Sequence, residues 1–193
     1  MASAALEGGF VDPAVDAAQV FRAALQAMAR PGSVHRVAGA RPPAPLSPAA
    51  GALGLTLLDH DTGLWLAPSL DSEAVRGWLS FHTGAPFVPP GEARFAFGRW
   101  EELPLERFPI GTPDYPDRSA TLVVEVGELA ENASREHRLT GPGIAREAWA
   151  TVPDPDALRA NRARFPLGFD VFLTCGERLS ALPRTVRVEG RLG

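Results

Sequence analysis

The chain has 193 residues, of which 45% are hydrophobic and 22% are charged, a composition that suits one well-cored globular domain better than two. Its net charge of −4 and the absence of any basic run argue against nucleic acid as the main partner. A single cysteine excludes an internal disulfide, and no apolar stretch approaches the ~20 residues that a membrane span needs. The N-terminus lacks a basic region followed by an apolar core, so we expect a cytoplasmic protein without a signal peptide.

All 19 basic residues are arginine, and the absence of lysine excludes two kinds of site. The chain cannot form a Schiff base with pyridoxal phosphate, which needs a lysine amine. It also cannot build a Walker A loop, which requires a lysine. Any phosphate contact must therefore use arginine, a backbone amide or a hydroxyl group.

The first half of the chain alternates helix and strand patterns. Asp12 and Pro13 start a helix with one apolar face, formed by Val20, Phe21, Ala24, Leu25 and Met28, and Pro31-Gly32 ends it. In chain order, the following patterns then predict a short strand at 34–37, a proline-rich extended loop at 39–48, a helix that starts at Ser47-Pro48, a strand at 63–66, and a helix capped by Asp71 that ends at 83–86.

The second half holds the strongest strand patterns. In chain order, it predicts strands at 95–98 and 120–126, a surface turn at 131–137, a strand at 138–140, a helix from Asp154-Pro155, a strand at 171–173 that is buried on both faces, and a half-exposed strand at 185–188. Helices alternating with short apolar strands predict an α/β fold with a layered, partly parallel sheet. We find no repeat and no interior linker, so we expect one domain over residues 1–193.

Three side chains are weak candidates for catalysis. His60 lies in Asp59-His60-Asp61, which offers three metal ligands, but neighbours on a helix point about 100° apart and the aspartates also suit bonds to turn backbone. His82 lies on the apolar face of a helix near its C-terminus, where a satisfied, partly buried histidine is the alternative. Cys175 follows a buried strand, where α/β proteins place their sites, or is a packed thiol. No metal site is predicted.

Two loops could hold an anion. Residues 114–119 offer hydroxyl, carboxylate and guanidinium groups, with Arg118 and Ser119 as candidate ligand-binding residues, or they form a turn that proline makes rigid. Residues 140–143 could expose backbone amides, or they form a tight turn. The chain contains no GxSxG or HExxH motif.

Five segments together resemble a known family. They read FRAALQAMARPG, LTLLDHDTGLWL, WLSFHTGAP, TGPGI and FPLGFDVFLTCGERLSALPRT, and the last is the most specific. From about residue 9 to residue 188 the chain is similar to PhnH, a subunit family of the bacterial carbon–phosphorus (C–P) lyase machinery for phosphonate use. The resemblance implies a three-layer α/β/α sandwich with a mixed sheet, similar to pyridoxal-phosphate-dependent transferases but without their cofactor site.

The resemblance also implies partners and a process. It implies a homodimer that joins the G, I and J subunits in a core complex, where ATP and an alkylphosphonate become a ribose-1-alkylphosphonate 5-triphosphate and adenine. The J subunit then cleaves the C–P bond with an iron–sulfur cluster and S-adenosylmethionine. One cysteine cannot hold such a cluster alone, so this chain is expected to carry no cofactor. No catalytic residue is implied for it.

Three hypotheses follow. The leading one is a non-catalytic subunit of the complex, which would bind partners through the proline-rich loop, the 114–119 loop, or a helix with Arg159, Arg162 and Arg164 that otherwise forms a solvated face. The second is a catalytic or nucleotide-sensing subunit, whose site would gather His60, His82, Arg118 or Cys175 at one sheet edge. The third is a free-standing hydrolase, for which no nucleophile constellation is visible.

Overall fold

The computed structural model describes residues 6–129 and 136–190, which form helices and strands in alternation. The α-helices are α1 (Pro13–Ala29), α2 (Pro48–Leu57), α3 (Glu73–Thr83) and α4 (Pro155–Ala163). The strands are β1 (His35–Arg36), β2 (Leu64–Leu66), β3 (Phe95–Gly98), β4 (Thr121–Glu125), β5 (His137–Thr140), β6 (Ala148–Ala150), β7 (Asp170–Cys175), β8 (Arg178–Leu182) and β9 (Arg187–Glu189). Short 3₁₀ turns are η2 (Pro90–Glu92), η3 (Trp100–Glu102), η4 (Leu105–Arg107) and η5 (Pro116–Arg118).

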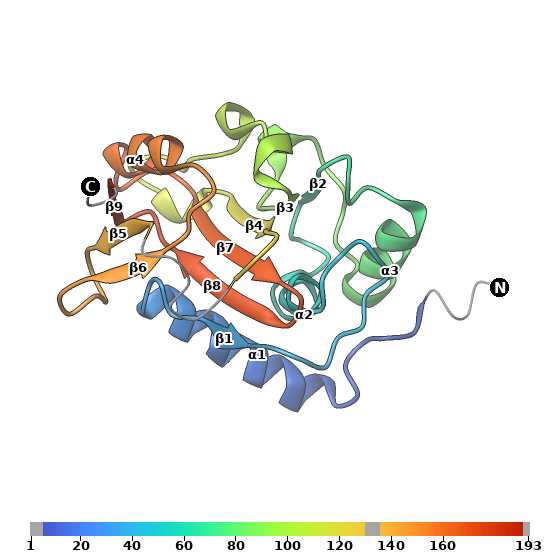
Figure 1. Ribbon diagram of the computed structural model, residues 1–193. Coiled ribbons are helices and arrows are strands. Elements are labelled where there is room, and N and C mark those ends of the chain that lie inside the picture. Colours follow the sequence, from blue (N-terminus) through green and yellow to red (C-terminus); the bar gives the residue numbers. More distant parts are fainter. Residues whose placement is uncertain (1–5, 130–135, 191–193) are drawn as a thin grey trace.

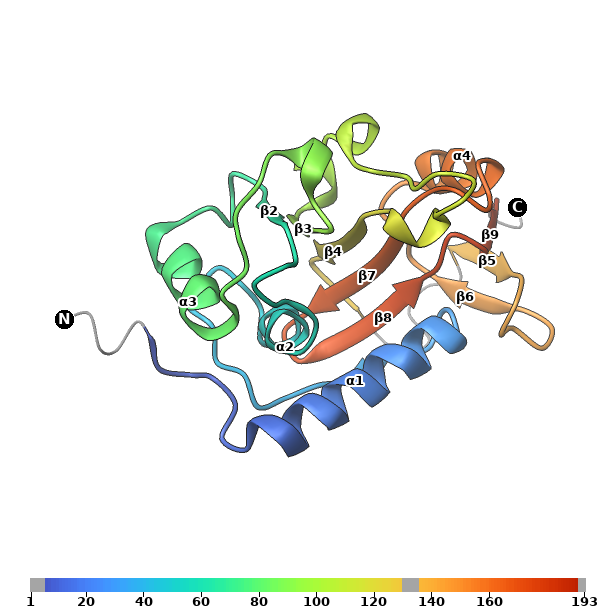
Figure 2. The ribbon, with the colours of Figure 1, turned by 180° about the vertical axis from the view of Figure 1, so that it is seen from behind.

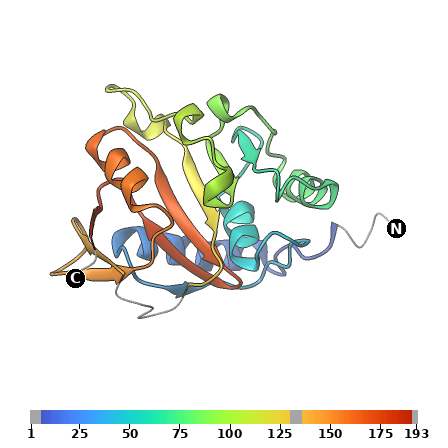
Figure 3. The ribbon, with the colours of Figure 1, turned by 45° about the horizontal axis from the view of Figure 1, so that its top comes forward.

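Six strands form a mixed sheet in the order β1-β8-β7-β4-β3-β2. Strands β2, β3, β4 and β7 are parallel, while β8 runs antiparallel to β7 and β1 antiparallel to β8. A second, three-stranded antiparallel sheet has the order β6-β5-β9. It lies at one end of the molecule and α3 at the other (Figure 1, Figure 2 and Figure 3). The predicted α/β fold with a partly parallel sheet is confirmed.

The central strands are buried on both faces because successive side chains of a strand point to opposite sides. On one face, Phe97, Val123 and Phe172 lie in register across β3, β4 and β7 and pack with α1, α2 and α3. On the other face, Leu122 and Val171 pack with Leu158 of α4 and with residues of the small sheet. Figure 1 shows α1 running along β8 on one side and α4 on the opposite side. The prediction of a doubly buried strand at 171–173 is confirmed.

Local capping explains where the helices begin. Asp12, Ser47 and Asp154 each accept a hydrogen bond from an amide of the following first turn, and proline follows each of them. The cap predicted for α3, Asp71, was wrong. Ser72, not Asp71, caps α3 by accepting from the Val75 amide, because the Asp71 carboxylate is engaged by the Arg76 guanidinium.

Two further differences from the sequence predictions come from long-range packing. Residues 178–182 form β8, which the sequence pattern did not predict, because hairpin pairing with β7 converts the run after Gly176 into a strand. The apolar face of α1 is also not continuous. Val20, Ala24 and Ala27 are buried, whereas Phe21 and Leu25 are about half exposed, at 47% and 54%.

Two predictions concern segments at the limits of the described chain. The turn predicted at residues 131–137 lies mostly outside the described residues, since only Glu136 and His137 fall within them and His137 begins β5. The longest described helix, α1, has 17 residues, and none of the described helices is both long and apolar enough to cross a membrane.

Candidate functional site

An open pocket of about 990 Å³ lies where the parallel strands end. Its wall includes Ser69, which follows β2, Arg99 and Trp100, which follow β3, Glu125 at the end of β4, and Gly127 beyond it. Ligands of α/β proteins bind outside the carboxyl ends of the strands, so the pocket occupies the expected location for a site. We refer to it as the carboxyl-edge pocket.

Glu125 is held at the rim of the sheet by two neighbours. Its Oε1 accepts a hydrogen bond of 2.8 Å from the Ser47 amide, and its Oε2 accepts one of 3.1 Å from the Thr174 hydroxyl. Ser47 caps α2 and Thr174 lies on β7, so three elements that are far apart in sequence fix this carboxyl group. The geometry leaves the group positioned and little able to rotate.

Burial raises the pKa of the Glu125 carboxyl above its ordinary value of 4.5. Hydrogen bonds from Ser47 and Thr174 and the positive charge of Arg99 lower the same pKa, but burial has the largest effect. A carboxyl group that retains its proton to a higher pH can exchange it with a ligand closer to neutrality. Glu125 is therefore the titratable group in the pocket that is best suited to acid–base chemistry.

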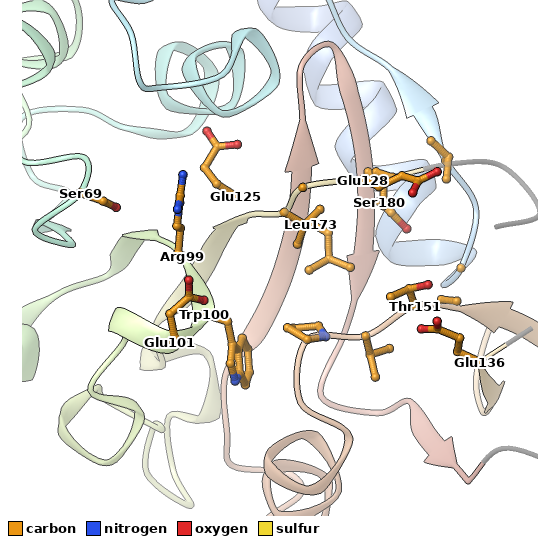
Figure 4. A pocket seen from close by; sticks show the side chains of 18 of the residues that line it. Ser69, Arg99, Trp100, Glu101, Glu125, Glu128, Glu136, Thr151, Leu173 and Ser180 are labelled. Atoms are coloured by element: carbon orange, nitrogen blue, oxygen red, sulfur yellow. The ribbon is translucent and has the colours of Figure 1, made fainter. Parts of the chain in front are cut away.

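Arg99 reaches the pocket because β2 and β3 approach closely at their ends. A Cβ on Gly98 would lie 2.4 Å from the Ala67 Cβ, so only glycine permits this approach. Figure 4 shows Arg99 and Glu125 on one side of the pocket and Glu128, Thr151 and Glu136 on the other. Among the described residues, Arg99 has no ion-pair partner within 4.0 Å, although its charge acts on Glu125.

Replacing Glu125 by glutamine is expected to remove a pH dependence of stability. Because the pKa of Glu125 is raised on folding, the folded state binds the proton more tightly, and the free energy of unfolding falls as the pH rises from 4.5 through the folded pKa. Glutamine can still accept from the Ser47 amide and can donate to the Thr174 hydroxyl. The variant should therefore gain stability relative to the wild type as the pH rises from 4.5 toward neutrality.

Urea unfolding across this pH range measures the difference. Glu92→Gln, a change at an exposed glutamate away from the pocket, serves as the control and should show no such trend. A stability difference between Glu125→Gln and wild type that stays constant with pH would contradict the assignment.

The histidine candidates lie away from this pocket. His60 is exposed in the turn before β2, with its ring beside the Asp61 carboxylate at 3.3 Å, while the Asp59 carboxylate accepts from the Asp61 amide as the turn alternative predicted. The His82 Nε2 lies 2.9 Å from the Leu6 carbonyl oxygen. Its ring packs against Trp78 at an interplanar angle of 59° and edge-on against Phe81. Within the described residues, no group of three histidine, cysteine, aspartate or glutamate side chains is arranged to hold a metal ion.

The other candidates are separated along the sheet. Cys175 lies at the carboxyl end of β7, where its thiol is 3.6 Å from the Gly127 carbonyl oxygen. Arg118 and Ser119 lie at the opposite edge, before β4 begins. The Arg118 guanidinium stacks 3.9 Å from the Tyr115 ring centroid, and the Ser119 hydroxyl accepts from Arg184. The catalytic role of Cys175 and the ligand-binding roles of Arg118 and Ser119 remain predictions, but the structure does not gather these residues into one site.

The sequence analysis missed Glu125, Arg99 and Thr174. A signal for Glu125 was present, because a carboxylate that directly follows an apolar parallel strand is placed at the edge where sites form. Arg99 follows the strand FAFG in the same way. Their common location could not be read locally, because it depends on β3, β4 and β7 being neighbours.

One protein family and one relative match nearly the whole chain, and a second relative matches less than half of it. Residues 8–189 match the family described as PhnH, bacterial phosphonate metabolism protein. The chain is 44% identical over 191 residues to the alpha-D-ribose 1-methylphosphonate 5-triphosphate synthase subunit PhnH of Rhizobium meliloti (strain 1021), a match that covers 94% of each protein. It is 37% identical over 90 residues to the putative C-P lyase subunit protein HtxG of Stutzerimonas stutzeri, which covers 44% of this chain and 45% of that protein.

Proposed function

Because this chain belongs to the PhnH family of bacterial phosphonate metabolism proteins, we propose that it is a subunit of a ribose 1-methylphosphonate 5-triphosphate synthase, in which it binds partners and supplies no catalytic residue. The observation that carries the proposal is the match to a synthase subunit over 94% of both chains. A correspondence of this length includes the core and the surface together, so it supports a common role in assembly as well as a common fold.

The partners and the process extend the proposal. The chain joins the G, I and J subunits of the cytoplasmic C–P lyase core complex, which makes a ribose-1-alkylphosphonate 5-triphosphate from ATP and an alkylphosphonate. Its fold is then a three-layer α/β/α relative of pyridoxal-phosphate-dependent transferases. Helices on both faces of the sheet support this relationship, and the absence of lysine agrees with the lack of their cofactor site.

Two features of the surface support a role in binding. The outward side of α1 carries Val15, Phe21 and Leu25, each about half exposed, and such apolar residues on one helix face suit a protein interface. Helix α4, by contrast, uses two of its arginine side chains for contacts within the chain. The Arg159 guanidinium donates to the Val188 carbonyl oxygen, and Arg162 stacks on Phe165.

A catalytic or nucleotide-sensing role is the second candidate, and one observation favours it. Glu125, whose pKa is raised by burial, lies with Arg99 in a pocket at the carboxyl edge of the sheet. Glu125 and Arg99, rather than His60 and His82, are therefore the residues to test for catalysis. Alanine at Glu125 or Arg99 should leave the turnover of a complete complex within a few-fold if the chain is non-catalytic, and should abolish it if the pair is catalytic.

Co-purification tests the subunit role directly. The tagged chain, expressed alone and together with its G, I and J partners, is expected to form a homodimer alone and a stoichiometric complex with them, as measured by light scattering and native mass spectrometry. If the chain remains apart while the other subunits fold and assemble normally, the proposed function is wrong.

A further inference from the structure

We propose that the outward side of α1 is a self-association surface, on which a second copy of this chain lays its own α1 in the opposite direction. The inference goes beyond the proposed function, which expects a homodimer of the isolated chain but assigns it no surface and no orientation. The surface, which we call the α1 stripe, is formed by exposed residues that share one side of the helix: Ala14, Val15, Ala18, Phe21, Arg22 and Leu25.

Helix α1 is apolar on two opposite sides. At about 100° per residue, Val20, Ala24 and Ala27 lie on one side, where they are buried in the core. The α1 stripe lies on the other side and faces away from the sheet. Figure 1 and Figure 2 show α1 at the margin of the molecule, with no other described element over its outer side. Because a helix that is apolar all round is normally buried all round, this side calls for a partner.

The exposed apolar side chains of the described chain are concentrated on this helix. Four of the seven large ones lie between residues 11 and 25. The other three lie apart from one another in sequence, at Phe81 in α3, at Tyr115 in the loop before β4 and at Phe165 after α4. A contiguous apolar surface marks an interaction site, whereas single exposed apolar residues are common on any surface.

The two ends of α1 carry opposite charges, which select an antiparallel copy of the same helix. Asp12 caps the start of α1 and Arg30 caps its end, and both are exposed. Among the described residues, neither takes part in an ion pair. An antiparallel second copy brings each carboxylate near the other copy's guanidinium and opposes the two helix dipoles. A parallel copy would instead place like charges together.

The side chains of the α1 stripe fit each other in the same orientation. With the two-fold axis beside Phe21 and Arg22, the ring of each copy faces the guanidinium of the other, an attractive arrangement. Leu25 then faces Ala18 of the second copy, and a large side chain over a small one lets two helices interdigitate closely. Gln19 and Gln26, which border the stripe, also face each other and can exchange amide hydrogen bonds. A two-fold interface requires a surface that matches its own copy in this way.

Charge also distinguishes a second copy from a lipid surface. The segment from Asp12 to Arg30 contains two aspartates and two arginines, so its charges cancel. Helices that lie on membranes carry an excess of basic residues on their polar face, which attracts anionic lipids. The α1 stripe therefore suits a protein surface with charges of both signs, as its own copy provides.

Phe21→Glu is the sharpest test. It places a carboxylate at the centre of the α1 stripe, and two-fold symmetry repeats the change, so we expect dimerisation to weaken by about 100-fold or more. Phe81→Glu, the same change at an exposed phenylalanine of α3, is the control and should leave dimerisation unchanged. Analytical ultracentrifugation gives both dissociation constants, and thermal melting followed by circular dichroism confirms that the variants fold.

Cysteine cross-linking tests the orientation in a Cys175→Ser background. Arg22→Cys lies beside the proposed axis, so a short bismaleimide linker should join its two copies. Ala14→Cys lies on the same side of α1, but in an antiparallel pair its two copies are more than about 20 Å apart, at a rise of about 1.5 Å per residue. It should therefore stay unlinked, whereas a parallel pair would link at both positions.

The outcomes separate the inference from the subunit role. If the wild-type chain is a dimer that Phe21→Glu leaves intact, or that Arg22→Cys does not link, the inference is wrong. If the wild-type chain is monomeric and Phe21→Glu weakens its assembly with the G, I and J subunits, another subunit covers α1, and the inference is wrong while the subunit role stands. A chain that dimerises through α1 but does not join these subunits overturns the proposed function alone.

Discussion

Replacing Arg184 by alanine is expected to lower the free energy of unfolding by about 3 kcal/mol. Its guanidinium is mostly buried, with 12% of the side chain exposed, and it pairs with Asp170 at 2.6 Å. It also donates to the Ser119 hydroxyl at 2.5 Å and to the Pro116 carbonyl oxygen at 2.9 Å. Alanine leaves the Asp170 carboxylate at the start of β7 without its cation, and an unpaired charge in a half-buried position is costly.

Arg184 joins three parts of the chain, so its loss should affect the amino edge of the whole sheet. Arg184 lies in the segment after β8, and its side chain contacts the loop before β4 and the first residue of β7. Urea unfolding followed by circular dichroism measures the change. Arg187→Ala on β9, an exposed arginine three residues further on, is the control and should change stability by less than about 0.5 kcal/mol. Equal effects of the two substitutions would show that Arg184 is not a structural anchor.

Replacing Trp78 by alanine is expected to cost about 4 kcal/mol. Trp78 is fully buried on α3, within the core that α1, α2 and α3 form on one face of the sheet. Its indole Nε1 also donates a 2.9 Å hydrogen bond to the Glu7 carbonyl oxygen. Alanine would leave a large cavity and would also loosen the segment before α1, which would then be held by the neighbouring His82 ring at the Leu6 carbonyl oxygen and by the Arg41 amide at the Gly8 carbonyl oxygen.

Trp78→Phe separates the two effects. Phenylalanine retains most of the packing but cannot donate to Glu7, so we expect a cost of about 1–2 kcal/mol and faster proteolysis near residue 7. Chemical denaturation gives the stabilities, and mass spectrometry after limited proteolysis locates the cleavage. If Trp78→Ala is no less stable than Trp78→Phe, burial of the indole is not what stabilises this helix.

The sequence predictions succeeded where the structure depends on neighbouring residues. The starts at Asp12, Ser47 and Asp154 were predicted because a cap and a following proline act within one helical turn. The sequence predictions failed where a contact with a distant residue or strand determines the local structure. Ser72 replaced Asp71 as a cap because Arg76 engages Asp71, and β8 formed because β7 offers it a hydrogen-bonding edge.

For the candidate site, too, the sequence predicted local features and missed those that depend on distant residues. Cys175 was correctly placed at a strand end, but the histidines that the sequence suggested lie elsewhere, His60 exposed in a turn and His82 against the N-terminal segment. Glu125 was passed over because its position at the end of an apolar strand indicates the sheet edge but does not show that the carboxyl group is buried. Its raised pKa arises from burial that other segments create.

The sequence by itself determined the family, the alternation of helices and strands, and the two-sided burial of the central strands, because periodicity, caps and apolar runs act over a few residues. Only the tertiary structure decided which side chains meet at the carboxyl edge of the sheet. Ser47, Arg99, Glu125 and Thr174 come together there because the strand order differs from the chain order, with β7 beside β4. Pairing between distant strands is set by the packing of the whole core, and no local pattern encodes it.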